Sequence, residues 1–271
     1  MTRKSTILER NNVRVLGQGS RTIMFAHGFG CDQKMWRYMI PAFEQDYRIV
    51  VFDYVGSGGS DWAAWSMHRY SSLDGYASDV LEILDSLDLR GVTFVGHSVS
   101  SIIGILAANR EPDRFSDLIL LGPSPRYIND PPYVGGFDVE DIEGLLESMD
   151  RNFIGWAQAM SPVVMKNPDR PELTEELEQS FCSTDPTITR KFAEVTFTSD
   201  NRQDLQGVTV PSLIVQCSED SVAPAEVGEY MRTNLPHSDF VQMSATGHCP
   251  HMSHPEETIR VIRERLAATQ Q

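Results

Sequence analysis

The stretch Val92-Thr-Phe-Val-Gly96-His97-Ser98-Val99-Ser100 decides the fold. Its apolar, β-branched start predicts a buried strand, and residues 102–108 continue as a helix. A serine between such a strand and helix is expected to stand on a sharp turn that lifts its hydroxyl clear of the sheet. The alternative interpretation is a solvated serine in an ordinary βα turn. The residues two before and two after it must be small. Gly96 is small, and Ser100 nearly so where glycine is usual.

Strand-like and helix-like segments alternate on both sides of this stretch. The alternation predicts an α/β fold with a mostly parallel sheet covered by helices on both faces. Glycines at 17 and 19 suggest that the chain opens with an antiparallel hairpin. The expected strands are 13–16, 22–26, 47–52, 92–95, 118–121, 213–217 and 240–243, and the expected helices of the core are 76–87, 102–108, 226–234 and 256–268.

The alternation breaks between residues 124 and 208, a segment too long for a plain loop. Helical spacing and intervening prolines predict four helices there, at 141–149, 154–164, 172–181 and 187–197. We therefore expect a core of residues 1–123 and 209–271 that carries an inserted helical lid, residues 124–208.

Composition excludes several classes of protein. Of 271 residues, 38 are acidic and 23 are Lys or Arg, which leaves a net charge of −15. Nucleic acid and anionic membranes would repel such a chain. No apolar run is long enough to span a bilayer, no signal peptide is evident, and the four cysteines are far apart, so we expect a cytoplasmic protein with reduced thiols.

A nucleophilic serine needs a base, and the base needs an orienting carboxylate. Two expected strands downstream of Ser98 end in such residues: Glu219-Asp220 follows the strand 213–217, and His248 follows the strand 240–243. The predicted catalytic set is Ser98, Asp220 and His248. Glu219 is the competing acid, and Asp220 is favoured because its short carboxylate stands directly before an apolar turn.

The oxyanion formed by attack on a carbonyl needs backbone N–H donors, one from the residue after the serine and one from the turn after an early strand. Val99 and Phe29 are the candidates, and His27 is interpreted as a residue that stabilises the Phe29 turn. His248, His251 and His254 lack the spacing and carboxylate of a zinc motif, so no metal is expected. Cys249 is expected to line the pocket.

The chain resembles the α/β-hydrolase superfamily, in particular the RsbQ-type bacterial stress regulators and the karrikin and strigolactone receptors of plants. The resemblance spans nearly the full length. It rests on Gly96 to Ser100, His27-Gly-Phe-Gly30, Phe52-Asp-Tyr-Val-Gly-Ser-Gly-Gly-Ser-Asp61, Gly122-Pro-Ser-Pro125, Asn129-Asp-Pro-Pro132, Phe181-Cys-Ser-Thr-Asp185 and Gly247-His-Cys-Pro-His251.

The resemblance implies a four-helix lid over a mostly apolar pocket and the same catalytic set. It implies Phe29, Phe137, Trp156 and Phe197 as pocket walls, although each could equally be simple lid packing. The expected function is hydrolysis of a small apolar ester or lactone without a cofactor. The alternative is a ligand sensor whose slow hydrolysis recruits a partner, which the resemblance implies to be a phosphatase with a sensory domain in a stress response.

Overall fold

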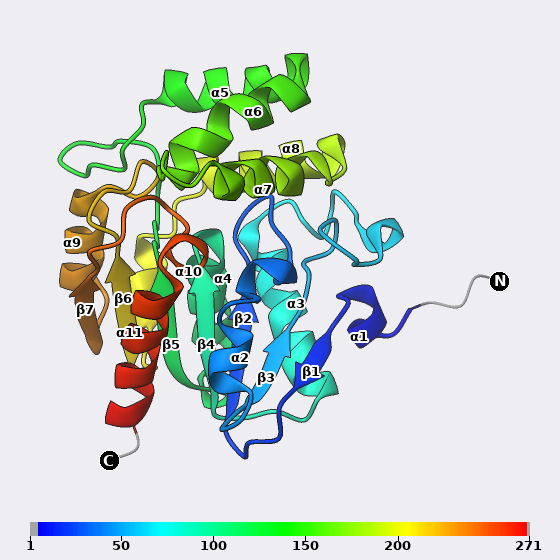
Figure 1. Ribbon diagram of the computed structural model, residues 1–271, viewed down its shortest axis with the longest axis vertical. Coiled ribbons are helices and arrows are strands. Elements are labelled where there is room, and N and C mark those ends of the chain that lie inside the picture. Colours follow the sequence, from blue (N-terminus) through cyan, green and yellow to red (C-terminus); the bar gives the residue numbers. More distant parts are fainter. Residues whose placement is uncertain (1–4, 270–271) are drawn as a thin grey trace.

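The computed structural model describes residues 5–269, which form a seven-stranded sheet in the order β1-β3-β2-β4-β5-β6-β7 (Figure 1). Neighbouring strands from β3 to β7 run parallel, and β1 runs antiparallel to β3. The expected α/β class is therefore confirmed. The strands are β1 (Arg14–Leu16), β2 (Thr22–Ala26), β3 (Arg48–Val51), β4 (Val92–His97), β5 (Phe115–Leu121), β6 (Ser212–Gln216) and β7 (Ser238–Gln242).

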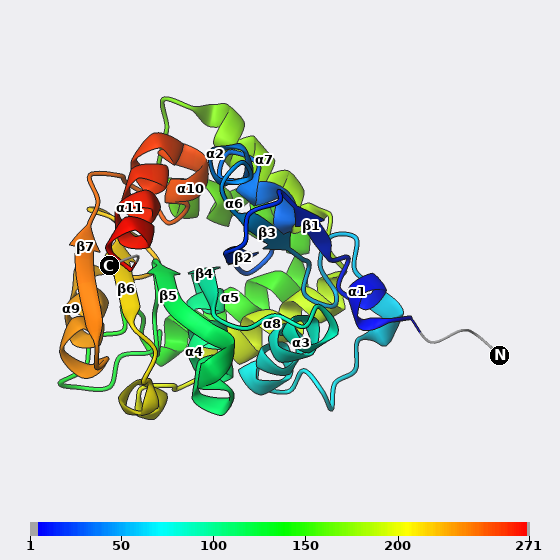
Figure 2. The ribbon, with the colours of Figure 1, turned by 90° about the horizontal axis from the view of Figure 1, so that it is seen from below.

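Helices cover both faces of the sheet, as Figure 2 shows from below. One face carries α3 (Leu73–Ser86), α4 (Val99–Arg110) and α9 (Ala225–Asn234), and the other carries α2 (Ile40–Phe43), α10 (Pro250–Ser253) and α11 (Pro255–Ala268). A short α1 (Ile7–Arg10) precedes the sheet. Within the described part of the chain, no helix combines the length and apolarity needed to cross a membrane. Side chains alternate along the strands to supply two apolar cores, one on each face.

The predicted opening hairpin is wrong. β1 pairs with β3, and β3 in turn pairs with β2, so the first two strands are not neighbours. Added Cβ atoms at Gly17 and Gly19 would lie 2.2 Å from the carbonyl oxygen of Tyr47 and 2.1 Å from that of Asp46. The glycines thus let the chain pass closely against the segment before β3 instead of forming a two-strand turn.

Each of the four segments with helical spacing between β5 and β6 forms a helix. These are α5 (Val139–Arg151), α6 (Phe153–Met165), α7 (Pro171–Cys182) and α8 (Pro186–Thr198). They lie together beyond one end of the strands of the sheet (Figure 1). Side chains of Asp138, Asn152 and Asp185 cap three of their N-termini, and Lys166 ends α6 in the left-handed conformation. We call α5–α8 the lid; its division from the core at residues 124 and 208 stays a prediction.

Three histidines are fully buried beside the sheet: His27, His97 and His251. The ring of His251 lies between those of Trp36 and His97, with centroids 4.5 Å from each. Burial lowers the pKa of all three, and for His97 to about 3. Each is therefore neutral in the folded protein at neutral pH.

These histidines predict a pH-dependent stability. The unfolded chain takes up their protons near pH 6.5, whereas the folded chain takes them up only at lower pH, so stability is full above pH 6.5 and falls as the pH drops below it. His97, whose pKa falls to about 3, is expected to cost about 1 kcal/mol per pH unit between pH 6 and 5, and the other two histidines act in the same direction. Urea unfolding of wild type and His251→Leu over this range tests it: the variant should show a smaller slope, and equal slopes would contradict the explanation.

Candidate active site

Ser98 occupies a strained turn between β4 and α4. Its backbone lies at φ 56° and ψ −123°, a conformation that side-chain-bearing residues rarely adopt. A Cβ atom added at Gly96 would lie 2.6 Å from the carbonyl oxygen of Ser100, which shows why position 96 must be glycine. The chain therefore forms the expected sharp strand-to-helix turn with the serine hydroxyl at its outer end.

Residues far apart in sequence converge on this hydroxyl. Nε2 of His248 lies 2.7 Å from Oγ of Ser98, and Nδ1 of His248 lies 2.7 Å from Oδ2 of Asp220. Because an ionised carboxylate only accepts, Nδ1 donates to Asp220 and Nε2 is left to accept the serine proton. The other Asp220 oxygen accepts the backbone N–H groups of Val222 and Ala223. The three side chains thus form a continuous relay.

Electrostatics separate the two candidate acids. Burial alone would raise the pKa of Asp220, but the adjoining His248 ring and the backbone donors lower it below its usual value, so the carboxylate stays ionised. Its side chain is 0% exposed. Glu219, in contrast, is 63% exposed and pairs with Lys166 at 2.8 Å. The structure therefore brings Asp220, and not Glu219, to the histidine.

The turn after β2 carries Phe29 next to this relay. Gly28 and Gly30 flank it, and Gly30 has a positive φ of 70°. His27 stabilises the turn, because its Nε2 accepts the N–H of Tyr54 at 3.1 Å. Val99, the other candidate oxyanion donor, is the first residue of α4. An N–H at a helix start has no partner within the helix, which suits it to bind developing negative charge.

Ser100 contributes more than small size, and sequence reasoning missed this. Its hydroxyl donates to the backbone carbonyl of His27 and lies 2.9 Å from the hydroxyl of Tyr54. A glycine, the usual residue at this position of the turn, would make neither contact. The hydroxyl therefore links α4 directly to the end of β2, from which the Phe29 turn starts.

The pocket beside Ser98 is small and apolar. Its volume is about 40 Å³, far below the roughly 300–1,000 Å³ of most small-molecule sites. Among the four predicted walls, Phe29 and Phe197 line it, whereas Trp156 and Phe137 do not. Cys249 lines it as expected. The other lining residues, besides Ser98 and His248, were not predicted as walls from the sequence; they are Cys31, His97, Val164, Leu177, Phe181 and Val222.

The two remaining predicted walls lie outside the pocket. Trp156 packs behind it, with its ring centroid 6.1 Å from that of Phe29 and 5.1 Å from that of Phe181. Phe137 is partly buried and packs against the apolar core on the same face of the sheet. Phe181 lines the pocket because its ring packs directly against the Phe29 turn. A Cβ atom added at Gly30, in that turn, would lie 2.2 Å from the Phe181 ring. The sequence held a hint of this, since Phe181 begins one of the motifs that carried the resemblance.

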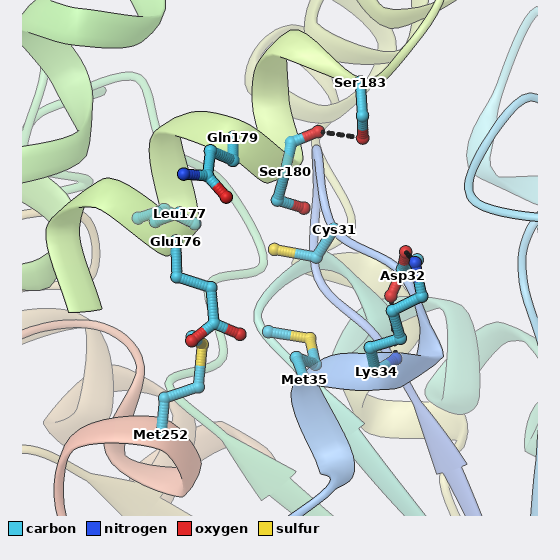
Figure 3. Close-up of a pocket in the computed structure, with 10 residues that line it drawn as sticks. All are labelled: Cys31, Asp32, Lys34, Met35, Glu176, Leu177, Gln179, Ser180, Ser183 and Met252. Carbon is cyan, nitrogen blue, oxygen red and sulfur yellow. Dashed lines mark hydrogen bonds and ion pairs between the residues drawn. The ribbon is translucent and has the colours of Figure 1, made fainter. Parts of the chain in front are cut away.

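A second cavity of about 270 Å³ adjoins the pocket. Figure 3 shows it between α7 and the short 3-10 helix Gln33–Trp36, with Glu176, Gln179 and Ser180 facing Cys31 and Met35. Cys31 and Leu177 line both spaces. The two cavities are thus separated by a wall of side chains.

The lid is bonded directly to the loop that carries His248. The N–H of His248 donates to the carbonyl of Val164 at 2.9 Å, and Nδ2 of Asn167 donates to the carbonyl of Thr246 at 3.1 Å. Gly247 fits under the end of α6, where a Cβ atom would lie 2.1 Å from the carbonyl oxygen of Met165. The His248 loop therefore depends on the lid for part of its support.

The three C-terminal histidines do not converge on one point. His248 faces Ser98, His251 lies between two rings on the other side, and His254 bonds its neighbour Ser253 at 2.9 Å. Over residues 5–269, no group of His, Cys, Asp and Glu side chains is clustered as a metal site would require.

Comparison with known proteins places this site in a family. Residues 21–255 match the model of the alpha/beta hydrolase fold family. The chain is 38% identical to a karrikin insensitive 2 receptor of Petunia hybrida, over 95% of this chain and 96% of that protein. It is 39% identical to a strigolactone esterase of Arabidopsis thaliana, over 96% and 97%.

Among solved structures, a hydrolase from Oleispira antarctica superimposes with a TM-score of 0.94 at 47% identity, over 98% of this chain and 96% of that one. A 3-oxoadipate enol-lactonase of Acinetobacter baylyi is more distant, at 22% identity over 90% of this chain and 88% of its own length. The family match over most of the chain and the near-full-length relatives show that the chain belongs to the α/β-hydrolase family, alongside the karrikin and strigolactone receptor-type hydrolases of plants.

Proposed function

We propose that this protein is a serine hydrolase of small apolar esters or lactones. The observation that carries the proposal is the relay of two 2.7 Å contacts, from Asp220 through His248 to Ser98, which ends at a hydroxyl held on a strained turn. Such a relay has one well-understood use, the activation of a serine for attack on an acyl carbon. Relatives named as an esterase and an enol-lactonase support the same reaction class.

The proposed reaction has two halves. Oγ of Ser98 attacks the acyl carbon while His248 takes its proton at Nε2, and the N–H groups of Phe29 and Val99 stabilise the oxyanion. His248 then protonates the leaving oxygen, the acyl–oxygen bond breaks, and an acyl-serine remains. Water attacks this ester, again with His248 as base, and the returning proton regenerates Ser98. Asp220 holds the ring tautomer throughout, and no cofactor takes part.

The substrate class follows from the pocket walls. Phe29, Phe181, Phe197, Leu177 and Val222 are apolar, and the polar groups in the wall belong mainly to the relay itself. An apolar, compact acyl group matches these walls, whereas a charged one would lose its hydration without compensation.

Replacing the nucleophile tests the central claim. Ser98→Ala is expected to lower the hydrolysis of an aryl acetate at least about 1,000-fold, because no other hydroxyl stands in the relay. Stability should not fall, since alanine removes only the reacting atom. Hydrolysis rates and thermal melting of wild type and variant check both points, and a folded variant with wild-type activity would reject the proposal.

The two neighbouring acids provide a matched pair. Asp220→Asn is expected to lower kcat by about 1,000- to 10,000-fold, because an amide presents the wrong partner to Nδ1 of His248. Glu219→Gln removes the same charge one residue away, but its side chain faces solvent, so kcat should change less than about twofold. Steady-state kinetics of both variants decide the acid, and the opposite order would reassign it to Glu219.

A second function, that of a ligand sensor, is favoured by the small volume of the pocket. A cavity of about 40 Å³ cannot hold an ester unless lid side chains such as Phe181, Leu177 and Phe197 move. Binding would therefore change the lid surface, which is the property a partner protein needs to recognise occupancy. The partner would be a phosphatase bearing a sensory domain, and the relatives that carry the name receptor support a signalling use.

Intact mass spectrometry separates the two functions. Wild type and Ser98→Ala are incubated with an aryl acetate and, separately, with a strigolactone. A short-lived adduct with many turnovers is expected for a hydrolase, whereas a persistent adduct with few turnovers would establish a sensor. An adduct that also forms on Ser98→Ala would place the reactive atom elsewhere and count against both.

A further inference from the structure

His97, the residue before the nucleophile, touches three segments of the active site. Its Nε2 lies 2.7 Å from the backbone carbonyl oxygen of His248, 151 residues away in sequence. Its ring packs at 5.0 Å from the ring of His248. On the other side, a Cβ added at Gly28 would lie 2.5 Å from Nδ1 of His97, so the ring fills the space behind the Phe29 turn.

The protonation state of His97 follows from these contacts. A carbonyl oxygen only accepts hydrogen bonds, so Nε2 of His97 carries the proton and donates a hydrogen bond to the backbone carbonyl of His248. Nδ1 is buried and has no hydrogen-bond partner among residues 5–269. Burial and the neighbouring His248 ring lower the pKa of His97 to about 3, which keeps the ring neutral. His97 is therefore a fixed single donor and not a second base.

This donor completes the support of the catalytic base. The backbone N–H of His248 is held by the carbonyl of Val164 in the lid, and its carbonyl is held by His97 in the core. His97 directly precedes Ser98 in the chain. The same short segment therefore fixes both the proposed nucleophile and the backbone of its base. Small shifts in such distances are costly, since a displacement of 1 Å can lower the rate about 100-fold.

We propose that His97 is a positioning residue that sets the distance between His248 and Ser98 through its hydrogen bond to the His248 carbonyl. The proposal rests on the proposed hydrolase function. It predicts that losing the donor lowers kcat more than it changes KM, because His97 is one of many side chains that line the pocket but holds the His248 carbonyl directly.

His251 offers a matched control in the same cluster. It is as deeply buried as His97 and touches the same ring at 4.5 Å. Within the described part of the chain, neither of its ring nitrogens has a hydrogen-bond partner. A leucine at either position therefore removes a buried imidazole of similar volume, but only the change at position 97 removes a bond to the base.

The experiment compares His97→Leu, His97→Gln, His97→Asn and His251→Leu by steady-state hydrolysis of an aryl acetate, with melting temperatures measured in parallel. His97→Leu is expected to lower kcat by about 10- to 100-fold, with a change in KM of less than about threefold. Glutamine can place an amide N–H near the former Nε2 and is expected to restore kcat to within about threefold. Asparagine is too short and is expected to resemble leucine, and His251→Leu should stay within about threefold of wild type.

Three results would overturn the proposal: a folded His97→Leu with wild-type kcat, an equal loss of kcat in both leucine variants, or glutamine and asparagine variants of equal kcat. If His97→Leu does not fold, the glutamine and asparagine pair decides alone. A failure of the proposed function is recognised separately, because hydrolysis that survives Ser98→Ala rejects the relay itself. Ser98-dependent hydrolysis that is insensitive to His97 rejects only the positioning role.

Discussion

The left-handed backbone of Ser98 is the constraint on which the rest of the site depends. It can be held only because β4 lies in the middle of the sheet, bonded to β2 on one side and β5 on the other. The carboxyl ends of parallel strands meet at one edge, so the Phe29 turn after β2, Asp220 after β6 and His248 after β7 arrive at the same place. Even Gly122, after β5, leaves room there for the His248 ring, which an added Cβ would approach to 3.1 Å.

The residues flanking Ser98 bind this arrangement together. His97 donates to the carbonyl of His248, and the hydroxyl of Ser100 donates to the carbonyl of His27. Both acceptors are main-chain carbonyl oxygens. One belongs to the loop that carries His248, and the other belongs to the segment that leads into the Phe29 turn. A five-residue stretch thus contacts the loop that carries His248 and the segment that leads into the Phe29 turn, as well as carrying Ser98, which gives the polar residues at 97 and 100 a structural purpose.

The sequence was sufficient to predict the parallel sheet and the lid helices, but not the pairing of β1 or the full pocket wall. Strand and helix periodicity located the parallel sheet and α5–α8, because burial patterns are local properties of the chain. The pairing of β1 with β3 was missed because Gly17 and Gly19 serve a close approach to residues 46 and 47, which no local pattern reveals. The pocket wall was predicted in part: Phe29 and Phe197 line it, but Phe181 displaces Trp156 because packing decides which of several lid aromatics faces inward.

The contact between the end of α6 and the His248 loop has a consequence for recombination between relatives. Met165 and Gly247 meet too closely for any side chain at 247, and Val164 and Asn167 bond the same loop. A lid taken alone from a relative would therefore bring different contacts to the His248 loop. Residues 164–167 and 246–248 therefore form one structural unit despite their separation in sequence. A chimera that takes both segments from a single parent preserves the geometry around His248.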